Sequence, residues 1–172
     1  MLSQIFQSIF VYIRLCFIKD TPASLPFSNI ILILVVLLDV LLRVISFETT
    51  AKISTGEVVF ASVLSLVFLL MTLFFLVYYV KKQTRWHKLA SALIGVEVLL
   101  FCILHPLISL LPNGQMPFSV ALLVMIWTMV IKGNILRKAL DFRLLNSVML
   151  ILAIEIISYI PFMFLVTEAT AQ

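Results

Sequence analysis

Charged residues are scarce in this chain. Only 12% of its 172 residues are Asp, Glu, Lys or Arg, and 63% are hydrophobic. A soluble domain carries about 25% charged residues, and one core of this size cannot hide so much apolar surface from water. The scarcity of charge therefore excludes a soluble globular protein and predicts an all-α integral membrane protein.

Cysteine, histidine and glycine are also rare, which restricts the chemistry. Cys16, Cys102, His87 and His105 are too few and too far apart to form a metal motif. The chain has no phosphate-binding glycine loop, no HExxH and no recognisable Ser-His-Asp or Cys-His pattern. We therefore predict a non-enzymatic protein with no catalytic residue, no cofactor and no metal. An enzyme acting on lipid would need a lateral opening with two convergent polar groups.

Long apolar runs fill most of the chain instead. Each run holds roughly 18–23 residues, enough to cross a hydrocarbon core of about 30 Å as a helix. Short polar segments separate the runs. We predict one bundle within 20–172, built from five transmembrane helices with spans at about 29–47, 58–80, 89–111, 117–135 and 144–166.

Residues 1–19 precede this bundle and have an amphipathic pattern. Gln7 and Arg14 fall opposite a set of apolar side chains at helical spacing: Leu2, Ile5, Phe6, Ile9, Ile13 and Phe17. This pattern predicts an interfacial amphipathic helix with its aromatic face in the acyl boundary. Two alternatives remain, a first transmembrane span and a helix packed on the bundle. The segment lacks the basic start and small-residue cleavage site of a signal peptide.

The distribution of Lys and Arg predicts the orientation. With the N-terminus inside, ten of these residues, Lys132 among them, fall in inner segments, and Lys52 alone falls in an outer segment. Positive residues gather on the cytoplasmic side of membrane proteins. We therefore expect a multi-pass protein of the bacterial inner membrane, with a cytoplasmic N-terminus and a periplasmic C-terminus.

The strongest basic cluster follows the second span and comprises Lys81, Lys82, Arg85, Trp86 and Lys88. It has two interpretations: a topology determinant alone, or a site for anionic lipid headgroups with Trp86 as interfacial anchor. Either accounts for the net charge of +4 without a nucleic-acid partner.

Five polar residues inside the predicted spans are the candidate site: Asp39, Arg43, Glu97, His105 and Glu155. Ionisable groups in hydrocarbon are costly, so each needs a partner or a wet cavity. Asp39 and Arg43 are four residues apart and share a helix face, and Arg43 is expected to pair with Asp39 or Glu155. Three interpretations remain open: a packing cluster that fixes helix register, a proton or ion relay, and a set of charges that face a partner's helix.

Two segments carry a family resemblance. They are Asp-Thr-Pro-Ala-Ser-Leu-Pro at 20–26, before the first span, and Gly-Asn-Ile-Leu-Arg-Lys-Ala-Leu-Asp at 133–141, before the last. With five spans and short connections, the chain resembles Yip-domain membrane proteins and their bacterial inner-membrane relatives. The Asp-Leu-Tyr-Gly-Pro motif of the eukaryotic members does not occur here, and no functional residue is carried over.

These patterns predict an accessory or scaffold protein that acts through helix–helix contacts. Its expected partners are the lipid bilayer and other membrane subunits, or further copies of itself. The alternative is a small transporter or proton-coupled channel that uses the intramembrane acids. A scaffold should have these acids paired and dry, whereas a transporter needs a water-accessible path to them.

Overall fold

The structure, a computed structural model, describes residues 2–25, 29–48, 55–109 and 117–171. Every element in these ranges is helical. The elements are α1 (Leu2–Cys16), η1 (Pro22–Ser24), α2 (Asn29–Glu48), α3 (Thr55–Tyr79), η2 (Gln83–Arg85), α4 (Trp86–Ser109), α5 (Phe118–Leu140) and α6 (Leu144–Ala171).

Four helical segments are long and apolar enough to cross a membrane. They are Thr55–Tyr79, Gln83–Ile108, Phe118–Leu140 and Leu144–Pro161. The predicted all-α fold is therefore confirmed for the described residues, and these four helices are consistent with a multi-pass membrane protein. The helix α2 has 20 residues and coincides with the first apolar run of the sequence.

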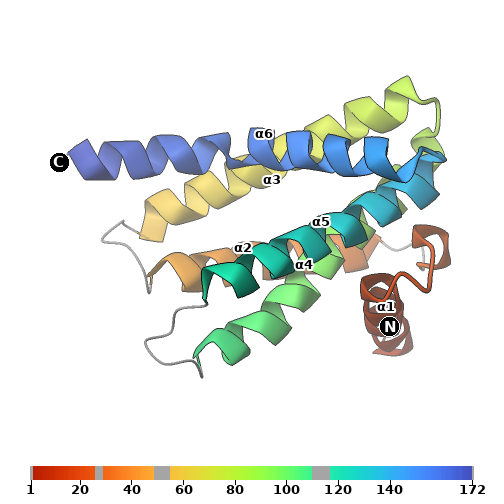
Figure 1. Cartoon of the computed structure of the whole chain (residues 1–172), viewed down its shortest axis with the longest axis horizontal. Helices are drawn as coiled ribbons and strands as arrows, with labels where there is room; N and C mark the ends of the chain where they lie inside the picture. The colour runs from red at the N-terminus through yellow and green to blue at the C-terminus, as the bar shows by residue number, and fades with distance from the viewer. Residues whose placement is uncertain (1, 26–28, 49–54, 110–116, 172) are drawn as a thin grey trace.

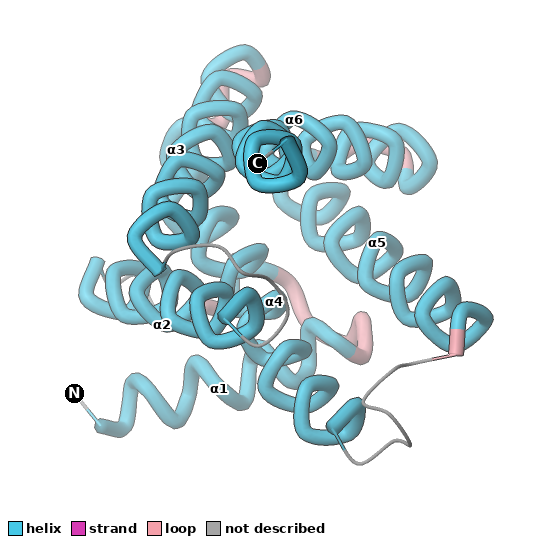
Figure 2. The backbone as a smooth tube through the Cα atoms, turned by 90° about the vertical axis from the view of Figure 1, so that its left-hand side faces the viewer, coloured by secondary structure: helices cyan, strands magenta, loops and turns pink. Residues whose placement is uncertain are grey.

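The long helices run between two ends of the molecule (Figure 1). The helix α6 packs against both α3 and α5, while α2 packs against α3 and α4. Viewed from the end where the chain terminates, α3 and α6 lie side by side above α2 and α4, and α5 flanks α6 (Figure 2). Fully buried Leu73, Leu89, Ile135 and Ile151 fill the centre. Aromatic side chains such as Phe60 remain exposed on the outside, which suits a surface solvated by lipid.

Small residues bring neighbouring helices close together. A Cβ added at Gly133 would lie 2.5 Å from Val148 Cγ2 and 3.2 Å from the backbone of the same residue, so α5 and α6 cross here at close range. On α3, the buried hydroxyl of Ser65 donates to the carbonyl of Ser158 on α6 at 2.6 Å. Such contacts are typical of helix pairs in membranes, where small and hydroxyl side chains replace the hydrophobic effect.

The N-terminal helix α1 lies across one end of the bundle and contacts α4 and α5. Its buried face includes Leu15 and Tyr12, whose ring lies over Gly95 and whose hydroxyl hydrogen-bonds Ser91 at 2.8 Å. Its other face keeps Phe6 and Phe10 exposed. The helix therefore packs on the bundle with one face and presents an aromatic face outward.

The same end of the molecule, which we call the basic end, carries the α3–α4 turn, the α5–α6 turn and the segment after α1. Lys82 bonds the Leu140 carbonyl at 3.1 Å and forms an ion pair with Asp141. Lys138 donates to the carbonyls of Ile18 and Asp20 at 3.1 and 2.7 Å. Lysine side chains thus join three chain segments that are far apart in sequence.

Candidate functional site: a chain of ion pairs across the bundle

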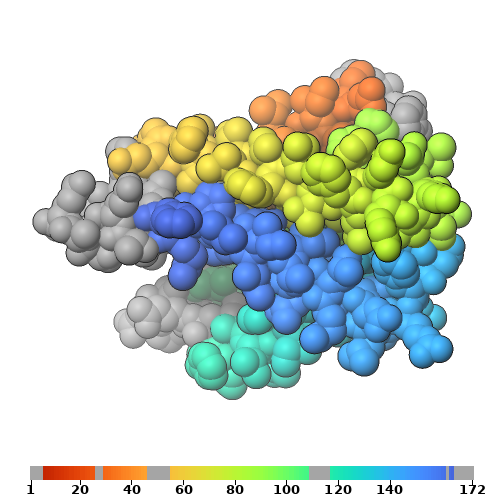
Figure 3. Space-filling model, turned by 90° about the horizontal axis from the view of Figure 1, so that it is seen from above, coloured from red at the N-terminus to blue at the C-terminus, as the bar shows by residue number. Residues whose placement is uncertain are grey.

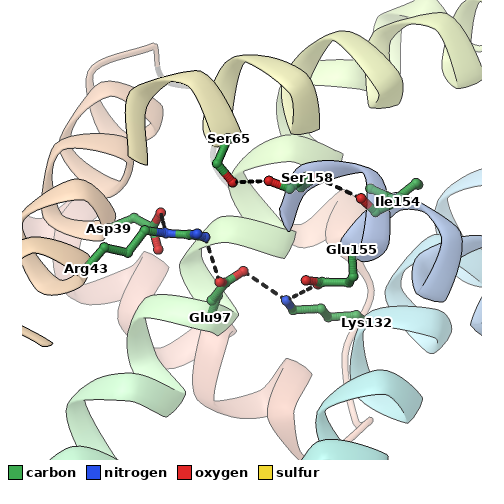
Figure 4. A network of polar contacts seen from close by, with 8 residues as sticks. All are labelled: Asp39, Arg43, Ser65, Glu97, Lys132, Ile154, Glu155 and Ser158. Carbon is green, nitrogen blue, oxygen red and sulfur yellow. Dashed lines mark hydrogen bonds and ion pairs between the residues drawn. The ribbon is translucent and has the colours of Figure 1, made fainter. Parts of the chain in front are cut away.

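Five charged side chains from four helices form one continuous network, which we call the ion-pair chain (Figure 4). Arg43 on α2 donates from Nε to Asp39 Oδ2 and from Nη2 to Glu97 Oε1 on α4, both at 2.8 Å. Lys132 on α5 donates to Glu97 Oε2 at 2.8 Å and to Glu155 Oε1 on α6 at 2.5 Å. Glu97 therefore links the two cations, with one carboxylate oxygen for each.

The members of the ion-pair chain lie at a common depth. Asp39 is ten residues from the start of α2, Glu97 eleven from the start of α4 and Glu155 eleven from the start of α6, while Lys132 is eight from the end of α5. At about 1.5 Å per residue, these positions are about 12–17 Å from the basic end. That depth is the middle of an apolar core of about 30 Å.

Burial differs along the ion-pair chain. The side chains of Asp39 and Lys132 are only 5% and 7% exposed, whereas those of Glu97 and Glu155 are 31% and 28% exposed. Mutual pairing offsets the cost of placing these charges in the bundle, and removal of one member would leave its partner's charge uncompensated. The network therefore fixes the rotation of α2, α4, α5 and α6 about their axes.

The ion-pair chain has three acids and two bases among the described residues. With all five groups ionised it carries one net negative charge, and an uncompensated charge is costly inside a membrane. A proton, a bound cation or a donor side chain from another molecule would remove that cost.

A groove between α5 and α6, the α5–α6 groove, reaches one end of the network. It has a volume of about 460 Å³, and its lining includes charged Lys132 and Glu155 together with apolar Met125, Leu152 and Ile156. Seen from above, the molecular surface is hollowed between α6 and the first part of α5 (Figure 3). The two helices meet closely at Gly133, and the groove lies on the other side of Lys132 from the basic end. Glu155 is therefore accessible from the side of the bundle, whereas Lys132 beside it is buried.

The structure corrects the sequence analysis at Lys132. The predicted fourth span ends at 135, with Lys132 near its end and counted among the inner cations, but α5 continues to Leu140 and Lys132 is buried. Three predicted intramembrane acids with Arg43 as the sole nearby arginine were themselves a sign that a second cation was missing. Arg43 pairs with Asp39, as one alternative proposed, and its other partner is Glu97 rather than Glu155.

His105 takes no part in the ion-pair chain that the described residues form. It lies on α4 two turns beyond Glu97 and stacks on Phe101, with ring centroids 5.0 Å apart. In the described ranges, no group of three or more His, Cys, Asp or Glu side chains is arranged to hold a metal ion.

The basic cluster divides into side chains with different contacts. Lys81 is exposed, Lys82 pairs with Asp141, and Arg85 Nη1 donates to the Ala139 carbonyl at 2.8 Å. Lys88 donates to the Ala23 carbonyl at 2.7 Å.

Trp86 from the same cluster is half-buried and makes an edge contact with Phe74, with ring centroids 6.0 Å apart. The indole ring therefore packs against α3.

Comparisons with known protein families, with curated proteins and with solved structures found no match for this chain.

Proposed function

We propose that this protein is an accessory or scaffold subunit of the bacterial inner membrane, which binds a transmembrane helix of another subunit in the α5–α6 groove. In this proposal α2 is a fifth span and α1 lies in the cytoplasmic interface. The N-terminus is cytoplasmic and the C-terminus periplasmic, because the basic end then faces the cytoplasm. The protein works through helix–helix contacts and carries out no chemical reaction.

The pairing of the intramembrane charges is the observation that supports this role best. All five members of the ion-pair chain have an opposite charge within hydrogen-bond distance. Arg43 and Lys132 occupy both carboxylate oxygens of Glu97, whereas a group that binds and releases a solute needs a free oxygen. A group that sets the arrangement of helices needs such contacts.

Charge complementarity supports a transmembrane helix with one donor side chain as the occupant of the groove. The ion-pair chain has one acid more than it has bases, and Glu155 at its end lines the largely apolar groove. A transmembrane helix with apolar residues and one Arg, Lys, Asn or Gln would fill the groove and place a donor near Glu155. Interhelical polar contacts of this kind stabilise membrane complexes by about 0.6–2 kcal/mol.

Photo-crosslinking in native membranes tests the proposal. A crosslinking amino acid at Met125 or Ile156, on the rim of the groove, is expected to trap one protein, whereas the same group at exposed Phe60 on α3 is not. Glu155→Gln should reduce trapping, and so should removal of the partner's donor residue. Crosslinks to lipid alone, to a second copy of this chain, or equally from all three positions would contradict it.

The exposure of two acids favours a second function, a small proton-coupled transporter or channel. Glu97 and Glu155 are each about three-tenths exposed, so the network is not sealed from the groove. Purified protein in liposomes would then carry protons or a solute, and Glu155→Gln would abolish the flux. Flux that persists in Glu97→Gln and Glu155→Gln together would reject this function.

The groove also meets one requirement of a lipid-active enzyme, a lateral opening. The charged groups that line it are an ion-paired lysine and glutamate. An ammonium held by two carboxylates is not a nucleophile, so this geometry favours binding over catalysis.

A further inference from the structure

A cavity at the basic end, separate from the ion-pair chain, combines positive charge with hydroxyl groups. It encloses about 450 Å³ between the η1 connector, the start of α4 and the end of α5. The polar side chains around it belong to Thr21, Thr84, Arg85, Lys88, Lys138 and Asp141. We call this cavity the basic pocket.

The basic pocket has an excess of positive charge. Three cations line it against one carboxylate, Asp141, and that carboxylate already pairs with Lys82, a residue that does not line the pocket. Arg85 is 3.7 Å from the same carboxylate and about half exposed, so the acid neutralises little of its charge. The pocket therefore keeps a charge of about +2 to +3.

Backbone carbonyls hold these cations in place without neutralising them. Lys88 Nζ is 2.7 Å from the Ala23 carbonyl, Lys138 Nζ bonds two carbonyls, and Arg85 Nη1 is 2.8 Å from the Ala139 carbonyl. An ammonium has three N–H donors and a guanidinium has five, so Lys88 and Arg85 keep donors for another group. A carbonyl carries no net charge, so each anchored cation retains its full attraction for an anion.

We propose that the basic pocket binds a phosphate group, with Arg85, Lys88 and Lys138 as its cations and the hydroxyls of Thr21 and Thr84 as further donors. A phosphate has several strong acceptor oxygens and a negative charge, which matches convergent cations and hydroxyls. The volume accommodates a phosphate together with a small attached group. The phosphate belongs to an anionic lipid headgroup or to a soluble phosphate.

The position of the basic pocket is compatible with a lipid source. It opens at the level of the interhelical turns, where headgroups lie if the bundle spans the membrane, and Trp86 begins α4 beside it. Basic pockets between transmembrane helices on the cytoplasmic side bind such headgroups. In this proposal, two residues of the basic cluster, Arg85 and Lys88, bind phosphate in addition to helping to set the topology by the positive-inside rule.

Native mass spectrometry of the full-length protein in neutral detergent tests the proposal. The probes are phosphatidylglycerol, zwitterionic phosphatidylcholine and inorganic phosphate. We expect one saturable phosphatidylglycerol adduct whose dissociation constant rises about tenfold in Arg85→Gln and in Lys88→Gln, since a charged hydrogen bond contributes about 1.5 kcal/mol. Exposed Arg143 lies outside the pocket, so Arg143→Gln changes net charge equally and should leave binding within about twofold.

The remaining outcomes separate the sources and guard against misfolding. Saturable binding of inorganic phosphate as tight as that of the lipid, with the same loss in both variants, supports the phosphate site and assigns it to a soluble ligand. Lys88→Arg keeps the charge and the carbonyl bond and should retain binding, which distinguishes lost recognition from a displaced η1 connector. Equal loss in Arg143→Gln, equal binding of phosphatidylcholine, or no saturable adduct would overturn the proposal.

Discussion

At the scale of single residues, Lys132 on α5 connects three helices of the bundle. It is nearly fully buried, and it is the cation that joins α4 to α6 through two carboxylates. Hydropathy alone does not predict this buried position, because a lysine near the end of an apolar run is normally assigned to the membrane interface. Pairing allows this lysine to lie where an unpaired one would be expelled.

Lys132→Met should lower stability strongly. It leaves Glu97 with one cation and Glu155 with none, at a cost of about 3 kcal/mol for an uncompensated buried charge. The measurement is thermal or denaturant unfolding in detergent. Adding Glu97→Gln and Glu155→Gln to this variant should recover much of the loss, because no unpaired acid then remains on α4 or α6. A triple variant as unstable as Lys132→Met would show that charge pairing is not the reason.

Asp141 should produce a small, removable dependence of stability on pH. Its hydrogen bond and ion pair with Lys82 lower the pKa of this exposed carboxyl below its ordinary 3.8. A lowered pKa means that the stabilisation is present above about pH 4 and is lost as the pH falls through the folded-state value. The difference in melting temperature between wild type and Asp141→Asn should therefore shrink between pH 6 and pH 3.

Asparagine is the appropriate substitution for this test. Residue 141 has a φ of 62° and a ψ of 36° at the end of α5, a left-handed conformation that Asn adopts readily. Asp141→Ala would add backbone strain and obscure the charge effect. A constant difference between wild type and Asp141→Asn across this pH range would contradict the assignment.

At the scale of helices, contacts through small residues determine where pairs cross. Small residues four positions apart, Ala61 with Ser65 and Ser91 with Gly95, form the small-xxx-small pattern that is typical of close helix contacts in membranes. In the structure Ser65 meets the backbone of α6, while Gly95 receives the ring of Tyr12 from α1. The pattern thus found close contacts, but it did not indicate which neighbour fills them.

Gly133→Ala should disturb the crossing of α5 and α6. The added Cβ would overlap Val148, and overpacking of this kind costs about 1–3 kcal/mol. Combining it with Val148→Ala should restore part of the stability by removing the clashing methyl groups. Gly56→Ala is the control, since a Cβ there meets nothing within 4 Å. Unfolding in detergent measures all three, and a neutral Gly133→Ala would show that the helices separate easily.

The helices themselves were largely predictable, and their mutual rotation was not. The predicted spans 29–47, 58–80 and 89–111 differ from α2, α3 and α4 by at most three residues at either end. The fourth span was five residues too short because Lys132 and Arg137 resemble a loop, although the helix continues through them. Apolar residues surround most of a helix such as α6, so its sequence does not indicate which side faces a neighbouring helix. For the same reason, the sequence did not predict that Glu97 pairs with two cations.

At the scale of the whole molecule, charge is strongly asymmetric between the two ends. The turns that join α3 to α4 and α5 to α6 lie together with the segment after α1, and their lysines cross-link them. The sequence predicted that most Lys and Arg residues lie at one end, because successive spans cross in opposite directions and these residues follow every second span. The correction at Lys132 moves one of the ten inner cations into the membrane and leaves the asymmetry intact.

Reporter fusions should show the C-terminus on the periplasmic side of a bacterial inner membrane. Alkaline phosphatase fused after Gln172 is expected to be active, and green fluorescent protein fused there is expected to be dark. A fusion in the α3–α4 turn after Lys82 should give the opposite result, because that turn lies at the basic end. The reverse pattern at both positions would reject the orientation. The same result at both positions would reject an odd number of spans between the α3–α4 turn and the C-terminus.

The ion-pair chain also has a consequence for how the protein is made. Its members alternate in sign along the sequence, from Asp39 through Arg43, Glu97 and Lys132 to Glu155, and each contacts the one synthesised just before it. Lys132 emerges 35 residues after Glu97, and Glu155 follows after 23 more. At about 5–20 residues per second, these intervals are about 1–7 seconds. After Asp39, each member of the ion-pair chain is therefore synthesised when a counter-charge that it pairs with has already been made.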